Sequence, residues 1–110
     1  MIQAQTKNDV LRVIRQNEAY LRAHGIMRIG LFGSFQRNEQ TANSDVDLLV
    51  EFAPAQKNFR NFMTIINYLE DSLQRDIELI TLESLSPYLG PKILKEVEYV
   101  SFANWLSPTY

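Results

Sequence analysis

The stretch from residue 29 to residue 51 constrains the fold of this chain more than any other part. It reads IGLFGSFQRNEQTANSDVDLLVE. An apolar segment over residues 26–32 is predicted as a β-strand and stops at Gly33 and Ser34, where the pattern breaks. A polar link then leads into a second apolar segment over residues 45–52, predicted as another strand. The stretch therefore predicts two strands joined through a turn that glycine permits.

The second strand carries two acids, Asp45 and Asp47. Side chains two residues apart on a strand point to the same face, so we expect the two carboxylates to project together. Their mutual repulsion is best relieved by a divalent cation, and hard oxygen ligands favour Mg²⁺ or Mn²⁺. This pair predicts a metal site.

The break at Gly33 and Ser34 predicts an anion site. Glycine lets the backbone approach a ligand closely, and serine is a common cap at the start of a helix. The N–H groups and the positive dipole end of such a turn favour a bound phosphate. A metal-binding strand that faces an anion-binding turn indicates a nucleoside triphosphate with its metals.

These residues resemble a known motif. Gly33-Ser34, ten further residues and Asp45-x-Asp47 resemble the G-S-x10-D-x-D motif of the DNA polymerase β-like nucleotidyltransferase superfamily. The short length is similar to its minimal nucleotidyltransferase (MNT) branch, whose members are commonly antitoxin partners of HEPN toxins. The resemblance implies an α/β (α+β) fold: a small mixed sheet of about three to four strands flanked by helices.

A third acid lies in a third predicted strand, residues 76–80. The segment resembles the family's third strand, where an aspartate precedes leucine and a β-branched residue, and the match falls on Glu78. Glutamate reaches one methylene further, and Mg²⁺ tolerates little error in its octahedral geometry. Asp76 is the alternative ligand if the register shifts by two residues. We favour Glu78, because Asp76 lies at the strand entrance.

The resemblance implies transfer of a nucleoside monophosphate, AMP from ATP, to a hydroxyl group, with two Mg²⁺ ions or Mn²⁺ in their place. The implied site residues divide into catalytic metal ligands and nucleotide-binding residues: Asp45, Asp47 and Glu78 for the first, and Gly33, Ser34 and Arg37 for the second. From its position in the polar link, Arg37 either meets phosphate or pairs with Glu39 or Glu51. Family members often have glycine where Asn38 stands, and asparagine tolerates the same left-handed turn.

The resemblance also implies the acceptor, a HEPN RNase toxin whose tyrosine near its active site is adenylylated and silenced. No segment resembles an acceptor-binding domain. Two alternatives stay open: an antitoxin that neutralises its toxin by contact alone, and transfer to a small molecule such as an antibiotic. The aromatic tail over residues 101–110 either folds back or is buried in a partner, where it can support a homo- or hetero-oligomer.

Composition narrows the classes further. The chain of 110 residues is expected to form one domain, residues 1–110, and its net charge of −2 argues against direct polynucleotide binding through a basic surface. The absence of cysteine excludes disulfides and thiolate sites, and the single histidine, His24, makes a catalytic triad improbable. No signal peptide and no membrane-spanning apolar run is recognisable, so we expect a cytoplasmic protein without membrane contact.

Three helices are predicted around these strands. The first covers residues 6–23, the second shows an apolar stripe over residues 59–73, and the last begins near Gly90 and Pro91 and is lined by apolar residues as far as Val100. Glu96 is expected mainly on the solvent-exposed face of the last helix.

Overall fold

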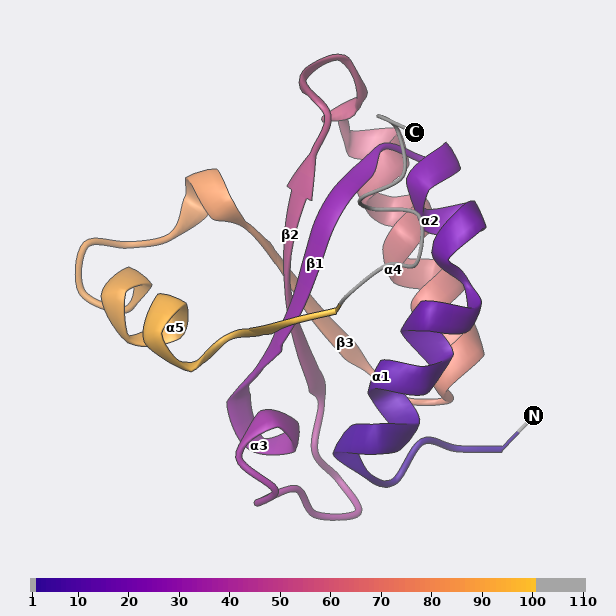
Figure 1. Ribbon diagram of the computed structural model, residues 1–110, viewed down its shortest axis with the longest axis vertical. Coiled ribbons are helices and arrows are strands. Elements are labelled where there is room, and N and C mark those ends of the chain that lie inside the picture. The colour runs from indigo at the N-terminus through magenta and orange to yellow at the C-terminus, as the bar shows by residue number, and fades with distance from the viewer. Residues whose placement is uncertain (1, 101–110) are drawn as a thin grey trace, which may run out of the picture.

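The computed structural model describes residues 2–100, which form a four-stranded mixed sheet with helices packed on it (Figure 1). In spatial order the strands are β3 (Ile77–Thr81), β2 (Val46–Phe52), β1 (Ile26–Phe32) and β4 (Glu98–Tyr99). Strand β1 runs antiparallel to β2 and to β4, whereas β2 runs parallel to β3. The predicted α+β class with a small mixed sheet is confirmed.

The helices divide between the two sides of the sheet. Helices α1 (Lys7–Gln16), α2 (Glu18–Ala23) and α4 (Phe59–Leu73) lie on one side, and α5 (Gly90–Glu96) lies on the other (Figure 1). The single turn α3 (Gly33–Gln36) follows β1 directly. Residues 2–100 also contain two short 3-10 turns, η1 (Pro54–Gln56) and η2 (Leu82–Ser84).

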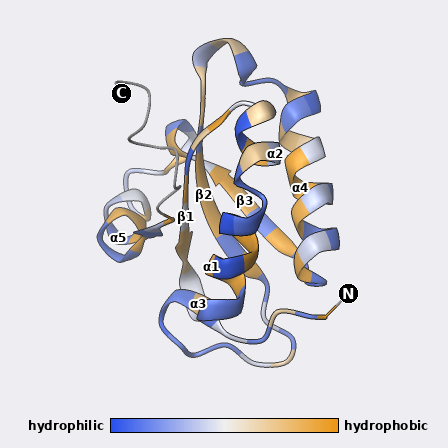
Figure 2. Ribbon diagram, turned by 45° about the vertical axis from the view of Figure 1, so that its right-hand side comes forward, coloured by the Kyte–Doolittle hydropathy of each residue, from blue (hydrophilic) through white to orange (hydrophobic). Residues whose placement is uncertain are grey.

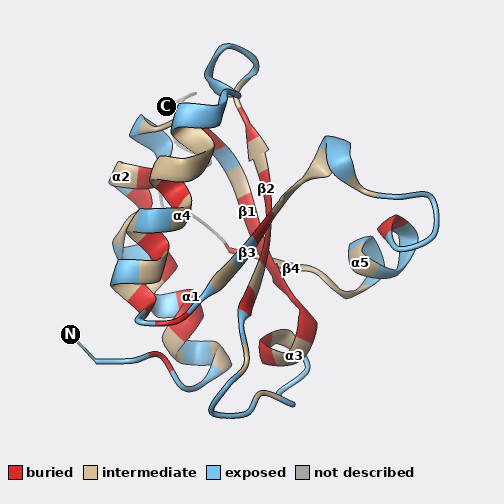
Figure 3. Ribbon diagram, turned by 180° about the vertical axis from the view of Figure 1, so that it is seen from behind, coloured by how far each residue is buried: buried red, intermediate tan, exposed pale blue. Residues whose placement is uncertain are grey.

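The core lies between the sheet and the helical layer (Figure 3). Val46, Leu48 and Val50 of β2 are fully buried, while Asp47 and Glu51 are half-buried. Because side chains alternate along a strand, the acids point to the sheet face opposite that of these core residues. Helices α1, α2 and α4 therefore cover the face of the sheet opposite the one to which the acids point.

The predicted helix over residues 59–73 is confirmed as α4, and its apolar residues face the sheet (Figure 2). Leu69 and Leu73 are fully buried, as the stripe predicts. Ile65 is also fully buried, whereas Phe59 at the helix start is 78% exposed. Contact with the sheet thus begins about a turn into the helix.

The predicted first helix, residues 6–23, is wrong in one respect: it is two helices that meet at Asn17. Asn17 has φ −107° and ψ 19°, and its side-chain amide donates to the Val13 carbonyl at 2.7 Å. Such competition between an asparagine side chain and the helix backbone is a common cause of a break. Thr6 caps the start in a capping box: its hydroxyl accepts a hydrogen bond from the Asp9 N–H, and the Asp9 carboxylate accepts one from the Thr6 N–H.

The predicted last helix is too long. Helix α5 ends at Glu96, and Glu98–Tyr99 form β4 by pairing with Gly30 and Leu31 of β1. Hydrogen bonding to the open edge of β1 outweighs the helical pattern of this segment, and the valines that follow α5 are stiff side chains suited to extended backbone. The aromatic tail lies outside the described residues. Within residues 2–100, every helix is too short or too polar to cross a membrane.

Candidate active site

The turn that follows β1 lies directly against an acid of β2. The register sets Phe32 opposite Asp47, and Gly33 has a φ of +78°. A Cβ atom at Gly33 would lie 2.0 Å from Asp47 Oδ2. Only glycine both adopts this left-handed backbone readily and leaves room for the Asp47 carboxylate. The turn and the acid strand, predicted to face each other, are therefore in contact.

Asp47 is paired with Glu78 across the parallel strands β2 and β3. Burial is the largest of the effects that raise the pKa of Asp47 to about 7, followed by a hydrogen bond to Glu78 and by the charges of Glu78 and Asp45. The positive charge of Arg37 works in the opposite direction. Two carboxyl groups held this close repel each other when both are ionised, so Asp47 keeps its proton to a higher pH than usual and, while protonated, donates to Glu78.

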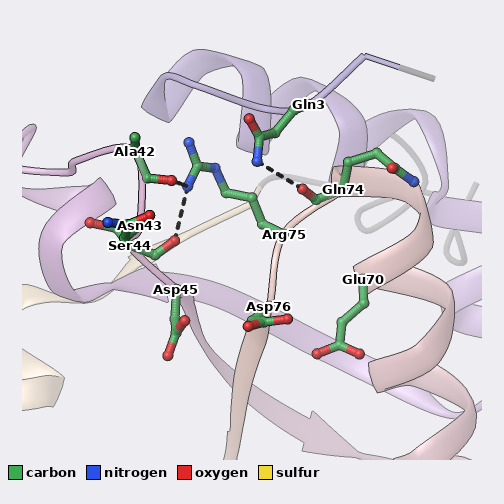
Figure 4. A pocket seen from close by; sticks show the side chains of 9 residues that line it. All are labelled: Gln3, Ala42, Asn43, Ser44, Asp45, Glu70, Gln74, Arg75 and Asp76. Carbon is green, nitrogen blue, oxygen red and sulfur yellow. Dashed lines mark hydrogen bonds between the residues drawn. The ribbon is translucent and has the colours of Figure 1, made fainter.

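Asp45 lies one residue before β2 and is exposed. It lines a pocket of about 560 Å³ together with Ser44, Arg75 and Asp76 (Figure 4). Asp76 precedes β3, and its carbonyl accepts a hydrogen bond from the Val46 N–H at 2.9 Å. The register places Glu78 opposite Asp47. Of the two acids considered for the third ligand, Glu78 and Asp76, Glu78 is the one that the sequence favours.

The acids fit a divalent cation by donor type. Within residues 2–100, no group of three or more His, Cys, Asp and Glu side chains is arranged to hold a metal ion. Asp47 and Glu78 nevertheless touch, and Asp45 lies near enough to raise the Asp47 pKa. These are oxygen donors, the type that Mg²⁺ and Mn²⁺ prefer. Loss of the Asp47 proton would leave a pair of charged carboxylates that a cation neutralises.

Of the predicted nucleotide-binding residues, Gly33 lies against Asp47, and Arg37 is near enough to lower the pKa of Asp47. The Ser34 hydroxyl has no hydrogen-bond partner among the described residues. Arg37 donates from Nε to Glu39 at 2.9 Å and from Nη1 to Glu96 at 2.8 Å, so the predicted pairing with Glu39 occurs, whereas Glu51 pairs with Arg28. Bonds to Glu96, and then to Glu39, raise the pKa of Arg37. Asn38 has a φ of 59°, the left-handed turn expected of it.

Two residues that the sequence did not single out contribute to this region. Glu96, expected on the wet side of its helix, has a side chain only 18% exposed and contacts Gly33 and Arg37. Arg75 is 9% exposed and donates to the carbonyls of Ala4, Ala42 and Ser44 at 2.5, 3.2 and 3.0 Å. These partners lie between 31 and 71 residues away in sequence, so no local pattern indicates them.

His24 lies far from the acids in the fold. It follows α2 and precedes β1, whereas the acids lie at the opposite end of that strand. Its ring stacks on Tyr20 with centroids 4.2 Å apart, and Nδ1 lies 2.9 Å from the Tyr20 carbonyl oxygen. These contacts give His24 a structural place at the helix end.

We expect Arg75→Met to lower the free energy of unfolding by about 2–4 kcal/mol, because three buried or half-buried carbonyls lose a charged donor. Methionine keeps most of the apolar stem, so the guanidinium is the main change. Urea unfolding followed by circular dichroism measures the effect. Arg60→Met is the matched control, because Arg60 is exposed on α4, and it should change stability by less than about 0.5 kcal/mol. Equal stability of the two variants would contradict this role of Arg75.

Several known proteins are similar to this chain in sequence or in fold. The family model described as "Polymerase beta, Nucleotidyltransferase" matches residues 15–102. The protein adenylyltransferase MntA of Thermococcus cleftensis is 32% identical over 96 residues, covering 86% of this chain and 96% of the relative. A solved structure described as a minimal nucleotidyltransferase has a TM-score of 0.73 at 27% identity, covering 86% of this chain and 95% of the other. A chain of the complex between a tri-AMPylated Shewanella oneidensis HEPN toxin and its MNT antitoxin has the same fold, with a TM-score of 0.59 at 20% identity, covering 86% and 74% of the two chains.

Proposed function

Because the chain belongs to the polymerase beta nucleotidyltransferase family, we propose that it moves AMP from ATP to a tyrosine hydroxyl of a HEPN RNase toxin and so acts as the antitoxin. The observation that carries the proposal is the contact of the Gly33 turn with Asp47, which is itself paired with Glu78. Phosphoryl transfer depends on position and charge more than on covalent chemistry, so a site of few residues suffices.

In this proposal Asp45, Asp47 and Glu78 would hold two Mg²⁺ ions, or Mn²⁺ in their place. Bound there, the cations would neutralise charge on the attacking and leaving oxygens of an in-line displacement at the α-phosphorus. The three carboxylates, which lie at the N-terminal ends of β2 and β3, would orient the reacting groups. The acceptor oxygen bonds to the α-phosphorus while the bond from that phosphorus to the pyrophosphate oxygen breaks, pyrophosphate leaves, and the hydroxyl proton passes to water.

Gly33, Ser34 and Arg37 are proposed to bind the triphosphate tail. The Ser34 hydroxyl, which has no partner within residues 2–100, can donate to a phosphate oxygen. Arg37 uses two of its N–H groups on Glu39 and Glu96, which leaves three of its five donors for an anion. The positive charge of Arg37 is close enough to lower the pKa of Asp47, so a phosphate bound by Arg37 would lie near the acids.

Two comparisons support a protein as the acceptor. The similar protein of Thermococcus cleftensis is named a protein adenylyltransferase. The Shewanella oneidensis complex pairs an MNT antitoxin with a HEPN toxin that carries AMP groups. A HEPN toxin as partner of this chain follows by analogy with these proteins.

A second candidate is an antitoxin that neutralises its partner by contact alone. It is favoured by glutamate at position 78, where the family pattern has aspartate, and by the absence within residues 2–100 of three ligands already arranged around one point. Under this alternative the chain would still bind the partner but would transfer nothing.

Intact-mass spectrometry separates the two candidates. Proteins that co-purify with the chain from its own host are incubated with ATP and Mg²⁺, in parallel with the Asp45→Asn/Asp47→Asn variant. A mass gain of one or more AMP groups on a partner, absent with the variant, is the expected result. A partner that co-purifies but never gains mass would contradict transfer and support neutralisation by contact.

A further inference from the structure

Glu96, the last residue of α5, joins the two ends of the Gly33 turn. Its Oε2 accepts a hydrogen bond from the Gly33 N–H at 2.6 Å, and its Oε1 accepts one from Arg37 Nη1 at 2.8 Å. Gly33 begins α3, and Arg37 is the residue that follows it. One carboxylate therefore holds both ends of this single helical turn through its two oxygens.

The charge of Glu96 and its partial burial strengthen its hydrogen bonds with Gly33 and Arg37. Burial raises the pKa of Glu96, but the Gly33 N–H and Arg37 outweigh burial and hold the pKa below its ordinary value. Hydrogen bonds of a charged acceptor are stronger than neutral ones. The Glu96 side chain is only 18% exposed, and moving it off the turn would leave the part-buried Gly33 N–H without this acceptor, which costs free energy.

The contact also orients Arg37. Glu96 binds Nη1 and Glu39 binds Nε, so the guanidinium is held from two directions. Three N–H groups of Arg37 stay available, because a guanidinium has five donors. A fixed guanidinium with spare donors loses less entropy when an anion arrives than a mobile one does.

We propose that Glu96 is a positioning residue for nucleotide binding: it fixes the Gly33 turn and aims Arg37 at the triphosphate without contacting the nucleotide itself. The proposal rests on the proposed function, since it assigns the triphosphate to Ser34 and Arg37. The competing account is that Glu96 occupies the anion position and must leave before ATP binds. The two accounts predict opposite effects when Glu96 is removed.

The test measures MgATP affinity by calorimetry, and the rate of AMP transfer as a function of ATP concentration, for Glu96→Ala and Glu96→Gln. We expect Glu96→Ala to weaken MgATP binding and to raise KM for ATP about tenfold, with kcat changed less than about twofold. Glu96→Gln keeps an acceptor for the Gly33 N–H but loses the charge, so we expect partial rescue, about threefold weaker than wild type.

Glu98→Gln is the matched control, because Glu98 lies two residues further on and pairs with Lys7 instead. It should leave both MgATP affinity and KM unchanged. A purely structural role for Glu96 would lower the melting temperature while KM stays constant, and that outcome would overturn the proposal. Tighter MgATP binding by Glu96→Ala would overturn it in favour of the competing account. Failure of the wild-type chain to bind MgATP or transfer AMP would instead overturn the proposed function, and this proposal with it.

Discussion

Replacing Asp47 with asparagine is expected to abolish AMP transfer while making the metal-free protein more stable at pH 8. Transfer should fall by about a thousandfold or more, because the variant loses the central one of the three proposed carboxylates. Stability should rise because Asp47 is charged at pH 8 although it is half-buried against Glu78. Asparagine has the shape of the protonated aspartate and can still donate to Glu78.

The sign of the pH effect follows from the raised pKa of Asp47, about 7 in the folded protein against an ordinary 3.8. Below about pH 4 the group is protonated in both the folded and the unfolded state, so it contributes nothing. Between about pH 4 and pH 7 the unfolded state loses the proton and the folded state keeps it, so stability falls as pH rises. Above pH 7 the loss is complete and constant.

Thermal unfolding of wild type and Asp47→Asn from pH 4 to pH 8, without divalent cations, measures this difference. Solvent screens a half-buried carboxylate, so we expect a gain of about 1–2 kcal/mol at pH 8, or roughly 5 °C in melting temperature, and no gain at pH 4. Asp71→Asn, at an exposed position on α4, should be the same as wild type at both values. An Asp47→Asn protein that melts below wild type at pH 8 would contradict this account and indicate a structural role for the carboxylate.

The sequence predicts those parts of the site that depend on residues close together in the chain. Apolar segments of strand length predict β1, β2 and β3, and the spacing between Ser34 and Asp45 brings in the motif resemblance. The parallel pairing of β2 and β3 then brings Glu78 opposite Asp47. That pairing agrees with the motif match and with the alternation of side chains along a strand.

The parts that the sequence does not predict depend on contacts between distant segments. Glu96 is one of several charged residues near the end of α5, and only the packing of that helix near α3 shows which of them meets Gly33. From its local sequence Arg75 would be expected on the surface. It is buried because the N-terminal segment and the loop at Ala42, both distant in sequence, supply the carbonyls to which it donates. Strand β4 has two residues, too few for a periodic pattern, and forms because the edge of β1 is open to it.

Gly33→Ala is expected to damage both folding and transfer. The added Cβ would lie 2.0 Å from Oδ2 of Asp47, 2.8 Å from Cγ and 3.1 Å from Cβ, on a backbone with a φ of +78°. Left-handed backbone costs a residue with a Cβ about 1–2 kcal/mol, and the clash adds to it, so we expect the free energy of unfolding to fall by about 2–4 kcal/mol. Relief of the clash would move the turn away from Asp47, so transfer should fall to background.

A double-mutant cycle with Asp47→Ala separates the two causes. Alanine at position 47 removes the Oδ2 and Cγ atoms that meet the new Cβ of Gly33→Ala but leaves the backbone strain. In that background Gly33→Ala should therefore cost only about 1–2 kcal/mol, measured by urea unfolding, and the difference between the two backgrounds is the coupling between turn and acid. Gly90→Ala is the control glycine, because its nearest neighbour is Leu85 Cβ at 3.2 Å and its φ is not positive. An equal cost of Gly33→Ala in both backgrounds would mean that the turn does not press on Asp47, and the contact that carries the proposed function would lose its support.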